Sequence, residues 1–113
     1  MLITSISGIR GTIGGKSGEN LTPVDVVAFA SAYGQWVSLQ YQQPIIVVGR
    51  DARESGEMFL GLTVATLVGL GIDVINLDLA TTPTVAMEVM RQGAQGGIII
   101  TASHNPKEYN GLK

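Results

Sequence analysis

The chain has 113 residues, of which 45% are hydrophobic and 14% are charged, and its net charge at pH 7 is −2. This is the size of one small domain, and the lack of an overall positive charge argues against a nucleic-acid partner. Because the sequence contains no cysteine, a disulfide scaffold, a cysteine-ligated metal and a cysteine nucleophile are excluded. No apolar run is long enough to span a membrane and the first residues do not resemble a signal peptide, so we expect a cytoplasmic protein without a membrane partner.

The first half of the sequence predicts a strand, a glycine-rich segment, a helix and a second strand. Residues 2–6 are mostly apolar and are followed by four glycines within residues 8–15. Thr22 precedes a proline and stands three residues before an aspartate, which is the pattern of a capped helix start, and we expect a helix over residues 23–40. The continuous apolar run at residues 45–48 predicts a strand that is buried on both faces.

The second half alternates helices with strands. Ser55 is placed to cap a second helix, a strand is expected over residues 72–79, a third helix over residues 82–93 and a further strand over residues 97–101. The apolar residues expected to pack from the third helix are Val85, Met87, Val89 and Met90. Residues 109–113 resemble the start of an extended segment with nothing after it to pair with. The alternation predicts an α/β domain with a mostly parallel mixed sheet and helices on both faces.

Polar side chains follow three of the predicted strands where each strand ends, at residues 50–53, 81–84 and 101–106. Since the carboxyl ends of parallel strands meet at one edge of a sheet, these loops should line a common site. Hydroxyl groups, cations and helix N-termini at such an edge favour an anion, and phosphate is the commonest candidate.

Ser103 and His104 lie directly beyond the last of these strands. Ser103 is the most reactive-looking position, although a serine before an Asn-Pro pair can also simply bond the turn backbone. His104 is the only histidine. A Ser–His hydrolase dyad is disfavoured because neighbouring residues in an extended segment point to opposite sides. His104 could instead help to hold a phosphate or bond locally.

Arg10 and Lys113 are the other two candidate site residues. Arg10 is followed by Gly11 and stands two residues after Gly8, and these glycines let the backbone approach a ligand closely. The alternative for Arg10 is a surface arginine on a hairpin. The alternative for Lys113 is a solvated lysine at a hairpin end.

Four motifs together resemble those of the α-D-phosphohexomutases, the family of phosphoglucomutases, phosphomannomutases and phosphoglucosamine mutases. The most specific is the Thr-Ala-Ser-His-Asn-Pro string at residues 101–106 with Tyr-Asn-Gly-Leu-Lys at residues 109–113. The others are Gly-Ile-Arg-Gly at residues 8–11, Gly-Arg-Asp-Ala-Arg-Glu-Ser at residues 49–55 and Thr-Pro-Thr at residues 82–84. The motifs stand in the family's order and span nearly the whole chain.

The resemblance implies a role for each candidate residue. The positions that match the family's catalytic and phosphate-binding residues are Ser103, Lys113, Arg10 and His104. Ser103 would carry the phosphoryl group, and Lys113 would act as general base or acid at the sugar hydroxyl. A Mg²⁺ ion would bind an oxygen of phosphorylated Ser103 together with aspartates of the family's second domain. Arg53 and Ser55 are expected to be mainly structural.

The resemblance also implies a longer protein. Residues 1–113 match the N-terminal part of the family's first domain, and the three domains that normally follow are absent from this sequence. The chain alone is therefore expected to be inactive, and it should self-associate through the surface that those domains would cover. The remaining domains and a phosphosugar are the expected partners.

The implied reaction is the interconversion of a hexose 1-phosphate and a hexose 6-phosphate by an intramolecular phosphotransferase, an isomerase. It would pass through a hexose 1,6-bisphosphate, which also acts as activator. Within the resemblance, a serine loop that begins with threonine, as at Thr101, favours glucose and mannose phosphates as substrates. The motif at residues 8–11, in contrast, is shared with phosphoglucosamine mutases. Two alternatives stay open: a phosphoglucosamine mutase, and a non-catalytic phosphate-binding or assembly module.

Overall fold

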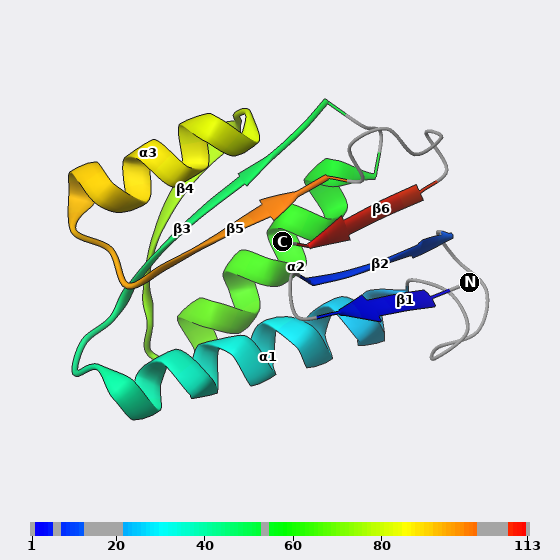
Figure 1. Ribbon diagram of the computed structural model, residues 1–113. Helices are drawn as coiled ribbons and strands as arrows, with labels where there is room; N and C mark the ends of the chain where they lie inside the picture. The colour runs from blue at the N-terminus through cyan, green and yellow to red at the C-terminus, as the bar shows by residue number, and fades with distance from the viewer. Residues whose placement is uncertain (1, 6–7, 13–21, 53–54, 102–108, 113) are drawn as a thin grey trace.

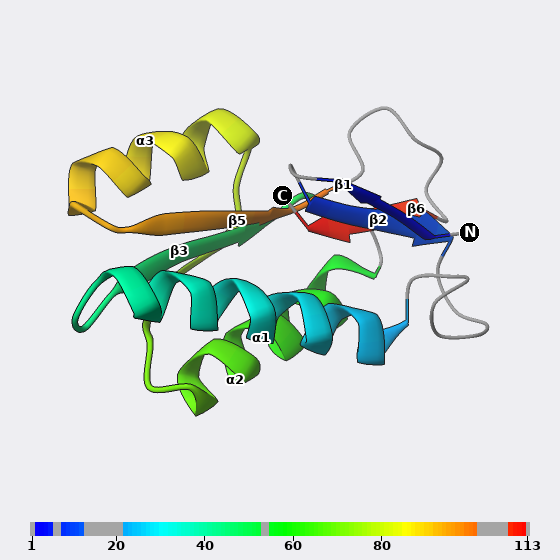
Figure 2. The same ribbon diagram turned by 60° about the horizontal axis from the view of Figure 1, so that its bottom comes forward.

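In the computed structural model, the backbone is described for residues 2–5, 8–12, 22–52, 55–101 and 109–112, and side chains are described for residues 22–52 and 55–101. One six-stranded sheet forms the middle layer (Figure 1). Helices α1 (Pro23–Gln40) and α2 (Gly56–Gly69) cover one face, and helix α3 (Thr82–Gln92) lies on the other (Figure 2). This arrangement confirms the predicted α/β fold with helices on both faces.

The strands are arranged in the order β1-β2-β6-β5-β3-β4. Their bounds are β1 Leu2–Ser5, β2 Gly8–Thr12, β3 Ile45–Arg50, β4 Asp73–Leu79, β5 Gly96–Ile100 and β6 Tyr109–Leu112. Strand β3 pairs in parallel with β4 and β5, as the strand–helix alternation requires. The mixed character of the sheet comes from β1, β2 and β6, whose pairings are all antiparallel.

The two ends of the chain meet in the antiparallel half of the sheet. Residues 8–12 of the glycine-rich segment, for which no strand was predicted, form β2 and pair with β1. Strand β6 lies between β2 and β5, so the last segment, which has nothing after it to pair with, pairs instead with strands that precede it in the chain. The partners of β6 come from before it in the sequence, about 100 residues away in the case of β2, and local pattern gives no signal for such pairings.

Helix α1 begins where the sequence predicted. The Asp25 carboxylate accepts hydrogen bonds from the backbone N–H of Thr22 (2.9 Å) and from its hydroxyl (2.7 Å). Proline at the first helical position adds no unsatisfied N–H. The buried side of the helix carries Val26, Ala30 and Val37, which repeat at helical spacing.

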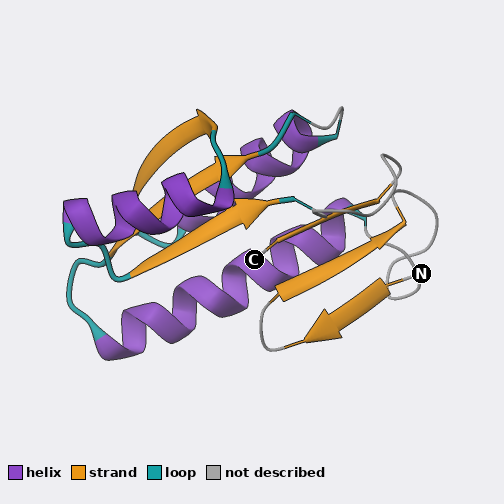
Figure 3. Cartoon of the chain, turned by 45° about the horizontal axis from the view of Figure 1, so that its top comes forward, coloured by secondary structure: helices purple, strands orange, loops and turns teal. Residues whose placement is uncertain are grey.

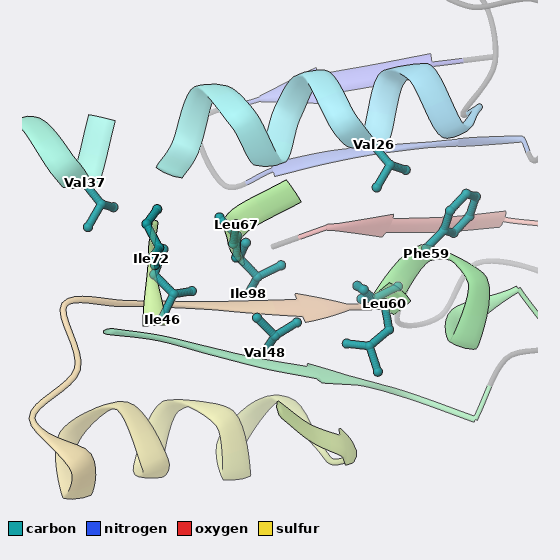
Figure 4. Close-up of a cluster of buried hydrophobic side chains, with 10 residues drawn as sticks. Val26, Val37, Ile46, Val48, Phe59, Leu60, Leu67, Ile72 and Ile98 are labelled. Atoms are coloured by element: carbon teal, nitrogen blue, oxygen red, sulfur yellow. The ribbon is translucent and has the colours of Figure 1, made fainter. Parts of the chain in front are cut away.

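Strand β5 shows how the two faces are packed. Ile98 and Ile100 belong to the cluster under α1 and α2 (Figure 4 shows Ile98 there), whereas Ile99 packs with Val85 of α3. The two glycines that begin the strand let both helices approach. A Cβ on Gly96 would meet the hydroxyl of Tyr33 in α1, and a Cβ on Gly97 would lie 2.7 Å from Val89 Cγ2 in α3.

Helix α3 packs less than its sequence suggested. Val85 is buried and Val89 is partly buried, but the side chains of Met87 and Met90 are 70% and 84% exposed, so their predicted packing was wrong. Methionine is apolar, but these two positions turn away from the one strip of α3 that touches β3 and β5. None of the helices in the described part of the chain combines the length and apolar character that a membrane crossing requires.

Candidate functional site

An open cleft of about 690 Å³ lies at the carboxyl ends of the parallel strands, where the sequence predicted a site. Its described lining residues are Arg50, Asp51, Ala52, Leu79, Ala80, Thr81, Thr82, Ile99 and Thr101. They come from the last residues of β3, β4 and β5 and from the segments that follow these strands, including the first residue of α3. Figure 3 shows the loops that leave the arrowheads of these strands. The cleft therefore has the position at which open α/β sheets bind ligands.

Backbone hydrogen bonds hold the three strand ends together at this edge. The N–H of Ala80 donates to the carbonyl of Arg50 (2.9 Å), and the N–H of Asp51 donates to the carbonyl of Ile100 (3.1 Å). Each bond extends a parallel ladder by one step beyond the strands themselves. These backbone hydrogen bonds fix the ends of β3, β4 and β5 relative to one another.

A short side-chain hydrogen bond at this edge joins Thr101 to Asp51. The Thr101 hydroxyl donates to Oδ2 of Asp51 across 2.6 Å, and it connects residues 50 positions apart in the sequence. Thr101 is buried, and Asp51 is partly buried. A hydroxyl bonded to a carboxylate at this distance is a strong, charge-assisted contact.

Arg50 was predicted to supply positive charge to the site, but its guanidinium is already paired. Nε of Arg50 lies 2.8 Å from Oδ1 of Asp78, and the Arg50 side chain is only 14% exposed. Asp78 takes a left-handed backbone conformation (φ 58°), and its N–H donates to the side chain of Asn76. The pairing of β3 with β4 shifts register here, from Val48 opposite Asn76 to Gly49 opposite Asp78, and such bulges re-aim side chains near sites.

The N-terminus of α3 also differs from its expected role as an anion site. The N–H of Thr84 donates to the Thr81 hydroxyl (3.2 Å), and the N–H of Val85 donates to the Thr81 carbonyl (3.0 Å). Pro83 has no N–H to offer. The helix start is therefore capped mainly by its own residues rather than left open for a ligand.

The candidate residues Ser103, His104 and Lys113 lie outside the described residues, as does Arg53. Of Arg10 only the backbone is described, in strand β2. Ser55 precedes α2 as predicted, but its side chain makes no capping hydrogen bond to the helix. For Ser103, His104 and Lys113, the structure describes only the neighbouring strands of the chain.

The strand register brings those positions together. Leu112 lies opposite Ile100 of β5 and opposite Ile9 of β2, and Arg10 lies opposite Gly111. In sequence, Lys113 follows Leu112 directly and Ser103 comes three residues after Ile100. The sheet thus brings the motif at residues 8–11 beside residues 110–112, about 100 positions later in the chain, in neighbouring strands. Sequence reasoning predicted the motifs but not this pairing.

A metal site can be tested only on the described side chains. Among them, no three histidine, aspartate or glutamate residues stand close enough to hold an ion together. The carboxylate of Asp51, which lines the cleft, binds Thr101, and the carboxylate of Asp78 binds Arg50. The described residues therefore do not fit Mg²⁺ by themselves.

Asp51, which lines the cleft, and Asp78, which pairs with the cleft residue Arg50, were missed as individual contributors. Asp51 and Asp78 bind the hydroxyl and the guanidinium described above, yet sequence reasoning singled out neither of them. Asp51 could have been found from its place directly after a buried strand. Asp78 carries no such signal, because its partner Arg50 is 28 residues away and the bulge that positions it is not visible in the sequence pattern.

Comparison with known proteins supplies the context. The family model described as phosphoglucomutase/phosphomannomutase, alpha/beta/alpha domain I, matches residues 2–113. A phosphoglucomutase/phosphomannomutase of Thermococcus kodakarensis is 41% identical over 106 residues, covering 91% of this chain and 23% of the relative. A phosphoglucosamine mutase of Levilactobacillus brevis is 41% identical over 111 residues, covering 94% of this chain and 24% of the relative.

A solved structure from the same family is also similar to this chain. The crystal structure of a phosphoglucomutase/phosphomannomutase family protein from Burkholderia thailandensis is similar to this chain with a TM-score of 0.76 and 29% identity. The match covers 95% of this chain and 24% of that one. The chain therefore spans about a quarter of the length of the relatives it matches.

Proposed function

This chain belongs to the phosphoglucomutase/phosphomannomutase family, and we propose on that basis that the longer protein interconverts the 1-phosphate and 6-phosphate of glucose or mannose. The observation that carries the proposal is the match of the family's first domain along residues 2–113, which includes all four motifs. The cleft at the strand ends supports it, because β5 leads to Thr101 at the cleft and Ser103 follows two residues later.

In the proposed reaction, Ser103 carries a phosphoryl group on its side-chain oxygen. The phosphorus–oxygen bond to Ser103 breaks as a hydroxyl of the hexose monophosphate attacks, and the hydroxyl proton passes to a general base, proposed to be Lys113. The product is a hexose 1,6-bisphosphate. Its other phosphoryl group then returns to Ser103, which leaves the isomeric monophosphate and restores the enzyme.

Arg10 and His104 are proposed to bind phosphate. The register supports a shared location, because the backbone of Arg10 pairs with Gly111, two residues before Lys113. Charge supports it as well, since Arg50, the described cation of the cleft lining, is paired with Asp78. Cations from other segments are needed to offset a phosphosugar dianion.

A magnesium ion is part of the proposal, although the described residues do not form its site. The only ligand proposed from this chain is an oxygen of phosphorylated Ser103. The remaining ligands would come from other domains of the longer protein, which are also its proposed partners. We place that protein in the cytoplasm, where phosphosugars are its substrates and hexose 1,6-bisphosphate its activator.

Phosphoglucosamine mutase is retained as a second candidate, because the relative from Levilactobacillus brevis with that name is as similar to this chain as the phosphoglucomutase/phosphomannomutase is. The cleft does not discriminate between them. Its described lining holds hydroxyl groups and apolar carbons but no unpaired carboxylate placed to bind an amino group.

The test uses the full-length protein with Mg²⁺ and hexose 1,6-bisphosphate. We expect turnover of glucose 1-phosphate or mannose 1-phosphate and a phosphoryl group on Ser103 by mass spectrometry, with both lost in Ser103→Ala. Turnover of glucosamine 6-phosphate alone would select the second candidate. No turnover and no phosphorylation of Ser103 would favour a non-catalytic phosphate-binding module. The isolated residues 1–113 should be inactive and should self-associate in light scattering.

A further inference from the structure

The bond between Thr101 and Asp51 has a fixed direction. A threonine hydroxyl has one proton, and here that proton is donated to a carboxylate oxygen at 2.6 Å. An ionised carboxylate cannot donate in return. The Thr101 oxygen can therefore act only as an acceptor toward any other partner.

The frame on which this pair stands is fixed from both sides. Asp51 is held to β5 through its own N–H, which donates to the Ile100 carbonyl, and the preceding residue accepts from Ala80 of the β4 loop. Thr101 is only 6% exposed, so its side chain has little freedom to turn. Asp51 is therefore anchored to the sheet backbone, and Thr101 directly follows the last residue of β5.

Thr101 also stands two residues before Ser103 in the sequence. Threonine hydroxyls commonly accept a hydrogen bond from backbone N–H groups a few residues further along the chain. A hydroxyl held permanently as an acceptor favours one path for the chain that leaves the sheet. Phosphoryl transfer depends strongly on such positioning, because the attacking and leaving oxygens must be in line.

We propose that Asp51 and Thr101 form a positioning pair: the carboxylate sets the direction of the Thr101 hydroxyl, and the hydroxyl sets the path of the chain toward Ser103. This inference rests on the proposed function, in which Ser103 is the phosphoryl carrier. Neither residue needs to touch the substrate. The pair acts on the rate of transfer to and from Ser103 and not on the affinity for the sugar.

The experiment compares variants of the full-length protein. Thr101→Val keeps the shape and removes the hydroxyl, Thr101→Ser keeps the hydroxyl, and Asp51→Asn keeps the size but can donate as well as accept. Thr63→Val is the matched control, since Thr63 is likewise a buried threonine. Its hydroxyl donates to the Phe59 carbonyl within α2, away from Asp51 and Thr101.

We expect kcat to fall about 10- to 100-fold in Thr101→Val, with KM within about two-fold of the parent. Asp51→Asn should also lower kcat, whereas Thr101→Ser should restore most of it and Thr63→Val should leave it unchanged. Backbone amides of residues 102–112 should exchange hydrogen faster in Thr101→Val than in the parent or in Thr101→Ser.

The proposal is overturned if Thr101→Val keeps the parent kcat, if Thr101→Ser loses as much as Thr101→Val, or if the amide exchange is unchanged. A parent protein without mutase activity or Ser103 phosphorylation would sink the proposed function instead. The exchange measurement would then still decide whether the pair orders the segment. A thermal denaturation of each variant identifies any loss that comes from unfolding.

Discussion

The two faces of the sheet are packed to different depths. Under α1 and α2, ten buried side chains from α1, α2, β3, β5 and the residue before β4 form one cluster (Figure 4). On the other face, α3 and the sheet bury a cluster of three, Val47, Val85 and Ile99, within the described residues. The hydrophobic packing is therefore thick on the face under α1 and α2 and thin on the face under α3. The N-terminus of α3 borders the cleft. We expect substitutions on the thick face to cost stability and those on the outer side of α3 to cost almost none.

The largest effect is expected at the centre of the thick face. Phe59 is completely buried in the cluster, so Phe59→Ala should lower the free energy of unfolding by about 3–5 kcal/mol. Urea denaturation of the purified protein measures this. A loss below about 1 kcal/mol would mean that the cluster relaxes to fill the space and that the two faces are more alike than described.

A smaller loss is expected where α3 approaches the sheet. A Cβ on Gly97 would lie 2.7 Å from Val89 Cγ2, so Gly97→Ala should destabilise the protein by about 1–3 kcal/mol. The matched control is Gly61→Ala in α2, whose Cβ would meet nothing within 4 Å. That variant should be stabilised by roughly 0.5–1 kcal/mol through helix propensity. Equal effects of the two variants would show that α3 shifts freely on the sheet.

The contact of α1 with β5 should make stability depend on pH. Burial raises the pKa of the Tyr33 hydroxyl above its ordinary value of 10.0, and a backbone hydrogen bond from Gly97 partly opposes this rise. Because the folded protein holds the phenol proton more tightly than the unfolded chain, the stability from this group is complete below about pH 10 and declines as the pH rises toward the folded pKa.

Tyr33→Phe tests this contact. The variant has no phenol to titrate, so its stability should fall less steeply above pH 10 than that of the parent. Thermal denaturation at a series of pH values measures this difference. Parallel pH curves for the variant and the parent would contradict the assigned role of Tyr33.

The smallest effect is expected on the outer side of α3. Met90 is 84% exposed, so Met90→Lys should change the free energy of unfolding by less than about 0.5 kcal/mol. The same denaturation assay measures it, with Val85→Ala as the buried comparison on this helix. A large loss in Met90→Lys would mean that this side of α3 is covered by another part of the protein.

Much of the fold was predictable because its signals are local. The capped start of α1 at Thr22, the apolar run of β3 and the glycine that ends α3 each depend on a few neighbouring residues, and each was confirmed. Strand β2 was missed, because glycine-rich segments read as loops unless a partner strand is known. The exposed methionines of α3 were missed because an apolar residue pattern does not show how wide the contact with the sheet will be.

The sequence by itself determined the α/β class, the order of the helices and parallel strands, and the place of the cleft, because helical and strand periods and the ends of parallel strands follow from local residue patterns. It also carried the motifs by which the family is recognised. Only the tertiary structure decided that β6 lies between β2 and β5, that Arg50 is neutralised by Asp78, and that Asp51 binds Thr101. These contacts join residues between 12 and about 100 positions apart, and the free energy that selects them comes from packing the whole sheet.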